Sequence, residues 1–208
     1  MYDSKTPLDQ FLAAAAARQP TPGGGSATAV VGALAAAMGE MVLQYSIGKK
    51  NQQAIDQELI PVLAEMTRAR QMLLQLMVED QIAYEALTRL KKLPADSQER
   101  KEEYAPALIA CIRVPEAMAV TGIVILELCD RVVNFANYYL LSDLAVCADL
   151  AMTTTRCGIY NVRVNLKDLP DEADRRKFEA NIGQMLHRAA ELIQRVSPRV
   201  WARDSQGI

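Results

Sequence analysis

Histidine is nearly absent from this chain of 208 residues, in which His187 is the only one. One histidine is too few for a histidine-based metal site and makes a Ser-His-Asp triad improbable, so no metal ligands are expected. Aromatic residues make up 5% of the chain and the formal net charge is −2. Nucleic-acid binding needs excess positive charge and stacking groups, so a nucleic-acid partner is not expected.

Cysteine is scarce as well. The four cysteines stand at positions 111, 129, 147 and 157 and form no C-x-x-C pair. This pattern indicates buried thiols in a reducing cytoplasm rather than a disulfide framework or a zinc site. The first residues also lack the basic region and apolar stretch of a signal peptide. We therefore expect a cytoplasmic protein.

Half of the residues are hydrophobic and 23% are charged, a balance that suits one globular domain over residues 1–208. No convincing strand pattern is present. The alternation at 161–166 resembles a strand, but a single strand has no partner, so this segment is predicted to be helical. The fold class is all-α. The expected helices are 7–18, 26–47, 52–93 with a kink or a break at Pro61, 99–113, 115–136, 142–167 with Ser142 as its cap, and 173–196.

The helix predicted at 26–47 is apolar on every face. Between residues 27 and 43 only Thr28 and Glu40 are strongly polar. Such a helix is either buried or spans a membrane. Its alanine-rich composition and Glu40 favour burial, so no membrane association is expected. Gly32, Ala36 and Gly39 leave room for close helix packing, which predicts a multi-helical bundle around this helix. The same small residues would also suit a subunit interface.

Asp80 lies on the apolar stripe of the helix predicted at 52–93. Its neighbours on the stripe, at three- and four-residue spacing, are apolar, whereas Glu79 lies to the side. An ionised carboxylate among apolar residues is costly unless it is paired. Asp80 is therefore either a structural group, which caps another helix or pairs with an arginine, or an acid or base whose pKa is raised by burial.

A narrow polar stripe follows the helix predicted at 142–167. At roughly 100° per residue its members fall within about 60° of one another, while the other faces are largely apolar. The stripe is either the wall of a pocket or a network of interhelical hydrogen bonds. Asp143 has a further explanation, because acids are common in a first helical turn. The stripe consists of Asp143, Cys147, Thr154, Gly158, Asn161 and Asn165.

Three consecutive glycines, Gly23, Gly24 and Gly25, precede Ser26 at the start of the apolar helix. Glycines permit positive φ angles and let a ligand approach the backbone, and a helix start offers free N–H donors. The run is not a phosphate-binding P-loop, since no Gly-Lys-Ser/Thr follows it. We expect it to face a ligand. Lys49 and Lys50 follow the same helix, where positive charge is also favourable without any ligand.

Together these features resemble the cyclodeaminase domain of the formiminotransferase-cyclodeaminase family, to which stand-alone methenyltetrahydrofolate cyclohydrolases are similar. The resemblance covers residues 8–195. The chain departs from the family pattern at 51–52, where a further Lys or Tyr is usual, and at 137–141, where a Gly-Asn-type turn is usual. The matching segments, in order, are Pro20 to Ala27, Gly48-Lys49-Lys50, Asp80 with Ala83-Tyr84, Val114-Pro115 with Ala117, Ser142-Asp143, and Asn161-Val162 with Asn165-Leu166.

The resemblance implies an all-α homodimer or larger assembly with a folate site and no metal or redox cofactor. The resemblance leaves two candidate reactions. In cyclodeamination, a ring-closing nitrogen attacks the formimino carbon of formiminotetrahydrofolate and ammonia leaves. In cyclohydrolysis, water adds to the methenyl carbon and the ring opens to formyltetrahydrofolate. Either reaction needs a proton acceptor, a proton donor and stabilisation of changing charge.

We assign the roles as hypotheses on this basis. Asp80 and Asp143 share the acid–base work, and the glycine run with Ser26 holds the pterin or the one-carbon unit. Asn161 and Asn165 bond the pterin edge, while Lys49 or Lys50 meets the glutamate tail or an acidic intermediate. The alternative is a catalytically silent helical scaffold or binding protein that kept the fold.

Overall fold

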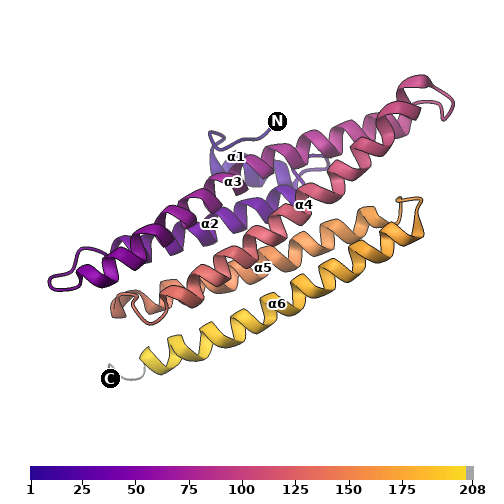
Figure 1. Ribbon diagram of the computed structural model, residues 1–208. Coiled ribbons are helices and arrows are strands. Elements are labelled where there is room, and N and C mark those ends of the chain that lie inside the picture. Colours follow the sequence, from indigo (N-terminus) through magenta and orange to yellow (C-terminus); the bar gives the residue numbers. More distant parts are fainter. Residues whose placement is uncertain (205–208) are drawn as a thin grey trace.

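The computed structural model describes residues 1–204, so the last four residues of the domain predicted over 1–208 lie outside the described part. All regular structure in residues 1–204 is helical, which confirms the predicted fold class. The long helices run alongside one another (Figure 1). Their bounds are α1 Leu8–Ala16, α2 Gly24–Gln44, α3 Gln53–Lys92, α4 Gln98–Val132, a 3-10 turn η1 Tyr138–Leu140, α5 Leu141–Leu166 and α6 Glu172–Asp204.

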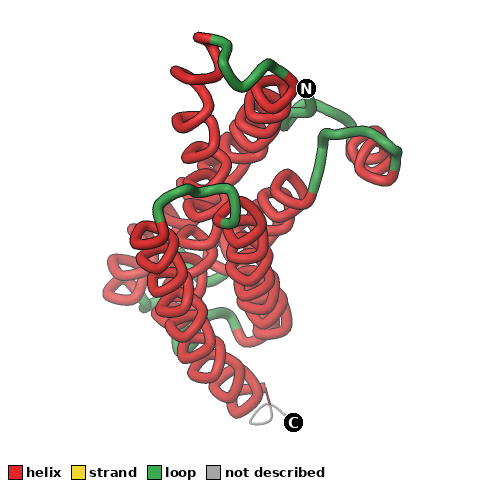
Figure 2. The backbone as a smooth tube through the Cα atoms, turned by 90° about the vertical axis from the view of Figure 1, so that its right-hand side faces the viewer, coloured by secondary structure: helices red, strands yellow, loops and turns green. Residues whose placement is uncertain are grey.

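The Ala/Gly-rich helix α2 is largely buried, as predicted, but the bundle does not surround it, because Leu34 on one side of α2 is exposed. It packs against α3, α4 and α5, while α6 covers α4 and α5 (Figures 1 and 2). Ala29, Ala35 and Ala36 have no exposed surface. Because each buried methyl group contributes little, the stability of this core comes from the larger side chains that α3, α4 and α5 pack onto α2.

Glycines at seven-residue spacing set how closely α2 approaches its neighbours. A Cβ atom on Gly32 would stand 2.8 Å from Thr154 and 2.9 Å from Leu73. A Cβ atom on Gly39 would stand 2.5 Å from Met66 and 3.1 Å from Cys147. Later residues of α2 thus meet earlier residues of both α3 and α5. Both neighbours run antiparallel to α2, at a separation that larger residues would prevent.

Prolines do not divide the helices where breaks were predicted. The helices expected at 99–113 and 115–136 form one helix, α4, and α3 continues through Pro61. Pro115 has no N–H to donate to the carbonyl of Cys111. The side-chain Nδ2 of Asn165 in α5 donates to this carbonyl instead, at 2.9 Å. A tertiary contact therefore supports the proline within α4, and the sequence of α4 alone does not reveal it.

The start of α5 also differs from the prediction. Ser142 was expected to cap this helix, but α5 begins at Leu141, directly after η1, and no side chain caps it. The preceding turn is held by Asn137, whose side chain accepts a hydrogen bond from the backbone N–H of Tyr139. Residues 161–166 are helical, as predicted, within the last turns of α5.

Helices α2 and α4 are both long and apolar enough to cross a membrane by length and composition alone. In α2, 61% of the apolar segment is buried inside the protein, and core helices commonly meet the same criterion. The charged residue of α2, Glu40, is buried and accepts hydrogen bonds from Arg70 Nε at 2.5 Å and from Thr67 at 3.1 Å. The paired carboxylate fits the burial predicted for α2.

Candidate active site

Asp80 on α3 points at the first turn of α2. The hydroxyl of Ser26 donates to Asp80 Oδ2 at 3.0 Å, and the backbone N–H of Ser26 also bonds this carboxylate. The residue before the helix, Gly23, provides no side-chain cap. Asp80 therefore caps α2 from another helix, which is the structural role that the sequence left open.

Burial raises the pKa of the Asp80 carboxyl, and the two hydrogen bonds from Ser26 offset this only in part. The raised pKa means that desolvation destabilises the Asp80 anion by more than the hydrogen bonds from Ser26 stabilise it. Asp80 thus holds a proton more readily than an exposed aspartate does, and its anion is a stronger base. Structural capping and acid–base chemistry are therefore compatible in this one residue.

Gly24 and Gly25, directly before Ser26, are required for space and not for an unusual backbone conformation. The expected positive φ angles are absent from Gly23, Gly24 and Gly25 within the described residues. A Cβ atom on Gly25 would instead lie 2.0 Å from Asp80 Oδ1, and one on Gly24 would lie 3.3 Å from Asn161 Oδ1. Gly24 and Gly25 let α3 and α5 bring polar side chains directly against the start of α2.

These residues line a pocket of about 270 Å³. Its wall includes the predicted site residues Asp80, Asn161 and Asn165 together with the glycine run. The first backbone N–H groups of α2 have no carbonyl partner in a preceding turn and carry the positive end of the helix dipole. The pocket thus combines a basic carboxylate, amide groups and a helix start, which can bind a polar heterocycle and exchange protons with it.

The two asparagines on α5 are already partly engaged. Asn161 Nδ2 donates to the carbonyl of Cys157 at 2.8 Å and contacts Thr28 Oγ1 at 3.4 Å. Asn165 Nδ2 donates to the carbonyls of Cys111 and Asn161 at 2.9 and 3.0 Å. Both interpretations of the polar stripe therefore hold. Its residues form interhelical hydrogen bonds, and those at its C-terminal end also line the pocket.

Asn165→Leu is expected to destabilise the protein by about 1–3 kcal/mol, because the Cys111 carbonyl beside Pro115 loses its donor. Urea unfolding followed by circular dichroism measures the change. Asn134→Leu makes the same substitution at an exposed position and serves as the control. An equally small effect at both positions would mean that Asn165 does not support the proline in α4.

Tyr84 and Cys111 also line the pocket, although the sequence reasoning assigned them no role. Tyr84 follows Asp80 by one helical turn, a spacing that could have identified it. Burial raises the pKa of the Cys111 thiol to about 11, with a further contribution from the negative charge of Asp80. At neutral pH Cys111 is therefore a protonated thiol and not a nucleophile.

Lys49, Lys50 and Asp143 do not reach this pocket within one chain. Asp143 stands 18 residues before Asn161 in α5, which separates them by about 27 Å along the helix axis. The two lysines follow the C-terminal end of α2, beside the start of α5, where Asn137 bonds Ser46 and Tyr45. The predicted residues thus form two groups at opposite ends of the antiparallel α2–α5 pair.

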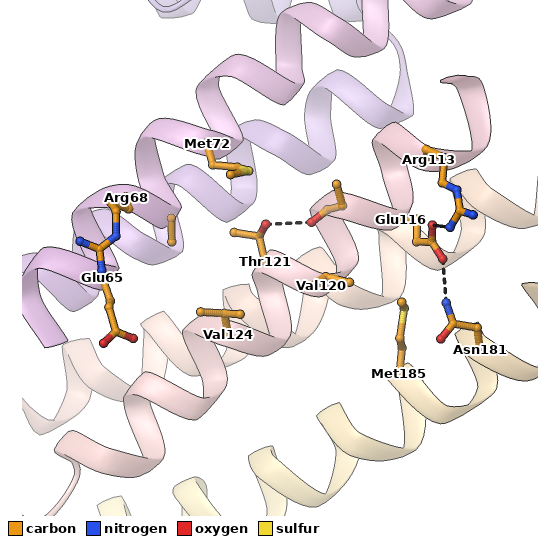
Figure 3. A pocket seen from close by; sticks show the side chains of 12 residues that line it. Glu65, Arg68, Met72, Arg113, Glu116, Val120, Thr121, Val124, Asn181 and Met185 are labelled. Atoms are coloured by element: carbon orange, nitrogen blue, oxygen red, sulfur yellow. Dashed lines mark hydrogen bonds and ion pairs between the residues drawn. The ribbon is translucent and has the colours of Figure 1, made fainter. Parts of the chain in front are cut away.

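A larger cavity of about 840 Å³ lies where α3, α4 and α6 meet (Figure 3). Its wall is mainly apolar, and its buried carboxylate, Glu116, is bonded by Arg113 at 2.6 Å and by Asn181 at 2.7 Å. Because Glu116 is fully paired, it is less available to a ligand than Asp80. The candidate active site is therefore the smaller pocket beside Asp80.

Comparison with known proteins agrees with the resemblance to folate enzymes that the sequence indicates. A methenyltetrahydrofolate cyclohydrolase from Methylorubrum extorquens is 31% identical over 193 residues, covering 91% of this chain and 93% of the relative. The formimidoyltransferase-cyclodeaminase of Sus scrofa is 30% identical over 203 residues, which cover 96% of this chain but only 38% of that protein.

The fold has a close counterpart in a crystal structure of formiminotetrahydrofolate cyclodeaminase from Thermotoga maritima. The TM-score is 0.81 at 29% sequence identity, and 97% of each chain is covered. Residues 7–184 match the family described as formiminotransferase-cyclodeaminase. Since this match spans most of the chain, the protein belongs to the formiminotransferase-cyclodeaminase family.

Proposed function

We propose that this protein is a one-carbon folate enzyme that acts on the carbon between two folate nitrogens, either as a formimidoyltetrahydrofolate cyclodeaminase or as a methenyltetrahydrofolate cyclohydrolase. The observation that carries the proposal is the carboxylate of Asp80, whose pKa is raised by burial at the start of α2. Relatives with both activities support it, and the cyclohydrolase matches over almost its full length.

Asp80 acts as the general base in this proposal. In cyclohydrolysis it takes a proton from the water that adds to the methenyl carbon, and a proton then goes to the nitrogen released as the C–N bond breaks. In cyclodeamination it takes the proton of the second folate nitrogen, which attacks the formimino carbon and closes the ring, and the departing ammonia receives one. The carbon stays at the oxidation level of formate in both reactions, so no redox cofactor is required. In this proposal Asp80 transfers the proton and no metal takes part.

The remaining pocket residues bind and orient the folate. The N–H groups of Gly24 and Gly25 lie at the positive end of α2 and suit the electron-rich edge of the pterin. Asn161 presents its Oδ1 next to Gly24 and serves as an acceptor for a pterin N–H. Asn165 holds the wall in place, since its amide group is committed to two carbonyls.

The protein acts in the cytoplasm as a homodimer or larger assembly, without nucleic acid or membrane, according to this proposal. The exposed apolar residues of α2, among them Leu34 and Tyr45, support self-association. Sedimentation at micromolar concentration tests the assembly directly.

The two activities are separated by supplying one substrate at a time. Incubation with methenyltetrahydrofolate is expected to remove the methenyl absorbance if the protein is a cyclohydrolase, and incubation with formiminotetrahydrofolate to produce it if the protein is a cyclodeaminase. A catalytically silent scaffold gives neither change and gains no thermal stability from the folate. Failure of both assays together with absence of such stabilisation would contradict the proposed function.

A further inference from the structure

Gln81, the residue after Asp80 in α3, is a glutamine without exposed surface. A buried side-chain amide is costly unless its donors and its acceptor are bonded. The Nε2 of Gln81 donates to the carbonyl of Tyr2 at 2.7 Å and to the carbonyl of Met77 at 3.0 Å. Its Oε1 accepts from the backbone N–H of Tyr2 at 2.8 Å. Gln81 therefore connects α3 to the N-terminal segment of the chain.

The amide of Gln81 fixes the position of Tyr2. Both backbone groups of Tyr2 bond the same planar amide, so Tyr2 cannot slide along α3 or turn away from it without losing a hydrogen bond. The bond to Met77, one helical turn earlier, also holds the Gln81 side chain in one orientation. The place of Tyr2 relative to α3 is thus defined by a buried group next to Asp80.

Tyr2 in turn contacts the chain that precedes α2. Its ring packs edge-on against Phe11 of α1, with the ring centroids 6.4 Å apart, and its hydroxyl accepts from Gln19 Nε2 at 3.3 Å. The turn between Tyr2 and α1 is closed by Asp3, whose Oδ1 accepts from the backbone N–H of Lys5 at 2.9 Å. The position that Gln81 sets for Tyr2 therefore extends to α1 and to Gln19.

The connecting segment, residues 17–23 between α1 and α2, forms part of the pocket wall. It contains no regular secondary structure, and its Pro20 and Thr21 line the pocket beside Asp80. Within residues 1–204, the backbone of this segment bonds only to itself and to the adjoining helices. Backbone hydrogen bonds alone therefore do not fix where this part of the wall stands.

Helix α1 gives the connecting segment little support by itself. Figure 2 shows α1 standing away from the bundle and joined to α2 by a loop. The helix has nine residues, of which Phe11 and Ala14 are buried. A helix of this length is marginal without tertiary contacts. The positions of α1 and the connecting segment therefore depend on the contacts of Tyr2 and Phe11.

Two side-chain hydrogen bonds attach the connecting segment. Gln19 bonds the hydroxyl of Tyr2, and the hydroxyl of Thr21 donates to Glu85 Oε1 at 3.0 Å. Glu85 stands four residues after Gln81, so the two anchors share one face of α3. Since Asp80 precedes Gln81 directly, it lies about 100° to one side of this face. One helix thus carries both anchors of the wall and the proposed base.

We propose that Gln81 is a positioning residue of the active site, which holds Tyr2 on α3 and thereby keeps the connecting segment in the place that the folate requires. This inference rests on the proposed function for the identity of the ligand. Gln81 is not a catalytic residue, because it is buried and does not line the pocket. It acts on the ligand through Tyr2 and Gln19.

The kinetics of Gln81→Leu test this role, because leucine fills a similar space without an amide. KM for the accepted folate substrate is expected to rise about 10-fold, since the free enzyme no longer holds the wall in its binding conformation. kcat is expected to stay within about twofold, because the hydrogen bond from Ser26 to Asp80 is untouched. Gln57→Leu makes the same substitution at an exposed position of α3 and should change neither constant.

A double-mutant cycle tests the path from Gln81 to the wall. Gln19→Ala removes the hydrogen bond to Tyr2 without touching the buried amide and is expected to raise KM about threefold. Gln81→Leu/Gln19→Ala is expected to raise KM about 10-fold, as Gln81→Leu does alone, and not by the roughly 30-fold of two independent effects. Tyr2→Phe removes only the hydroxyl and should match Gln19→Ala.

Limited proteolysis measures the position of the connecting segment without reference to activity. Arg18 is exposed within this segment, so trypsin cuts the Arg18–Gln19 bond when the segment is displaced. Cleavage there is expected to be about 10-fold faster in Gln81→Leu and about threefold faster in Gln19→Ala than in the wild type. Cleavage after Lys50, in the loop between α2 and α3, is the internal control and should not change.

Three results would overturn the positioning role of Gln81. The first is a loss of kcat at unchanged KM in Gln81→Leu, the second is multiplication of the two KM effects in the double variant, and the third is equal cleavage at Arg18 in all proteins. A wild-type protein inactive on both substrates would instead contradict the proposed function, while the proteolysis still decides whether Gln81 holds the segment.

Circular dichroism verifies that Gln81→Leu stays helical. If it does not fold, Gln19→Ala and Tyr2→Phe decide the question, because both leave the buried amide and its bonds to the backbone in place. Wild-type KM together with wild-type cleavage at Arg18 in both of these variants would overturn the proposal.

Discussion

Asp80→Asn is expected to lower kcat by about 100-fold or more and to raise the midpoint of thermal unfolding. The loss of rate follows because an amide cannot accept the proton of the attacking group. The gain in stability follows because the variant no longer buries a charge, while its side-chain oxygen can still accept the hydrogen bond from Ser26. Steady-state kinetics and calorimetry measure the two effects on the same samples.

The sign of the stability effect depends on pH. Burial raises the pKa of Asp80 in the folded state, so the folded protein binds this proton more tightly than the unfolded chain does. The stabilisation from the proton is fully present below the unfolded pKa and is lost as the pH rises through the folded pKa. The stability advantage of Asp80→Asn should therefore be largest at neutral pH and disappear in strong acid.

Glu79→Gln provides the control, because it neutralises the neighbouring carboxylate, which is exposed and lies outside the pocket. It is expected to leave kcat and the unfolding midpoint nearly unchanged. An Asp80→Asn variant that kept its activity and changed only in stability would reduce Asp80 to a cap of α2. Equal losses of activity in both variants would point to a general effect of charge.

Gly25→Ala is expected to lower turnover about as much as the loss of Asp80 itself. The new Cβ would lie 2.0 Å from Asp80 Oδ1 and 2.4 Å from its Cγ, so the carboxylate must rotate away from Ser26. Because the displaced atoms end a short side chain, the helices can stay in place and the loss of stability should be moderate. The rate and the urea midpoint distinguish these two effects.

Gly183→Ala is the control for the glycine substitution, since nothing lies within 4 Å of its added Cβ and it lies within α6. It is expected to stabilise the protein by roughly 0.5–1 kcal/mol through helix propensity, without a change in rate. The double variant Gly25→Ala/Asp80→Ala should unfold later than the sum of the two single effects predicts, because the clash is gone. Additive effects would contradict the proposed contact.

Much of the fold follows from sequence periodicity, because the helices of this chain bury apolar stripes over many turns. The burial of α2 follows from its lack of polar residues. The continuity of α4 through Pro115 does not follow, since it depends on Asn165, which is 50 residues later in the chain. The start of α5 was also misplaced, because η1 leads directly into it and a Ser142 cap is not needed.

The candidate site was predictable only in part. Asp80 is conspicuous because a carboxylate interrupts an apolar stripe. The glycine run lines the pocket, but the positive φ angles expected of it are absent. The close approach of Asp80, which requires Gly25, cannot be seen before α2 and α3 are packed. Asp143 and Asn161 share one face of α5, but an angular pattern does not show that about 27 Å of helix separates them.

The dependence of kcat on pH tests the central claim most directly, namely that burial turns Asp80 into the base that moves the protons. The wild-type rate should fall as the pH decreases through an apparent pKa above the ordinary value of an aspartate, because the protonated carboxyl cannot accept a proton. The residual rate of Asp80→Asn should lack this acidic decline. The same decline in both proteins would contradict the assignment of Asp80 as the base.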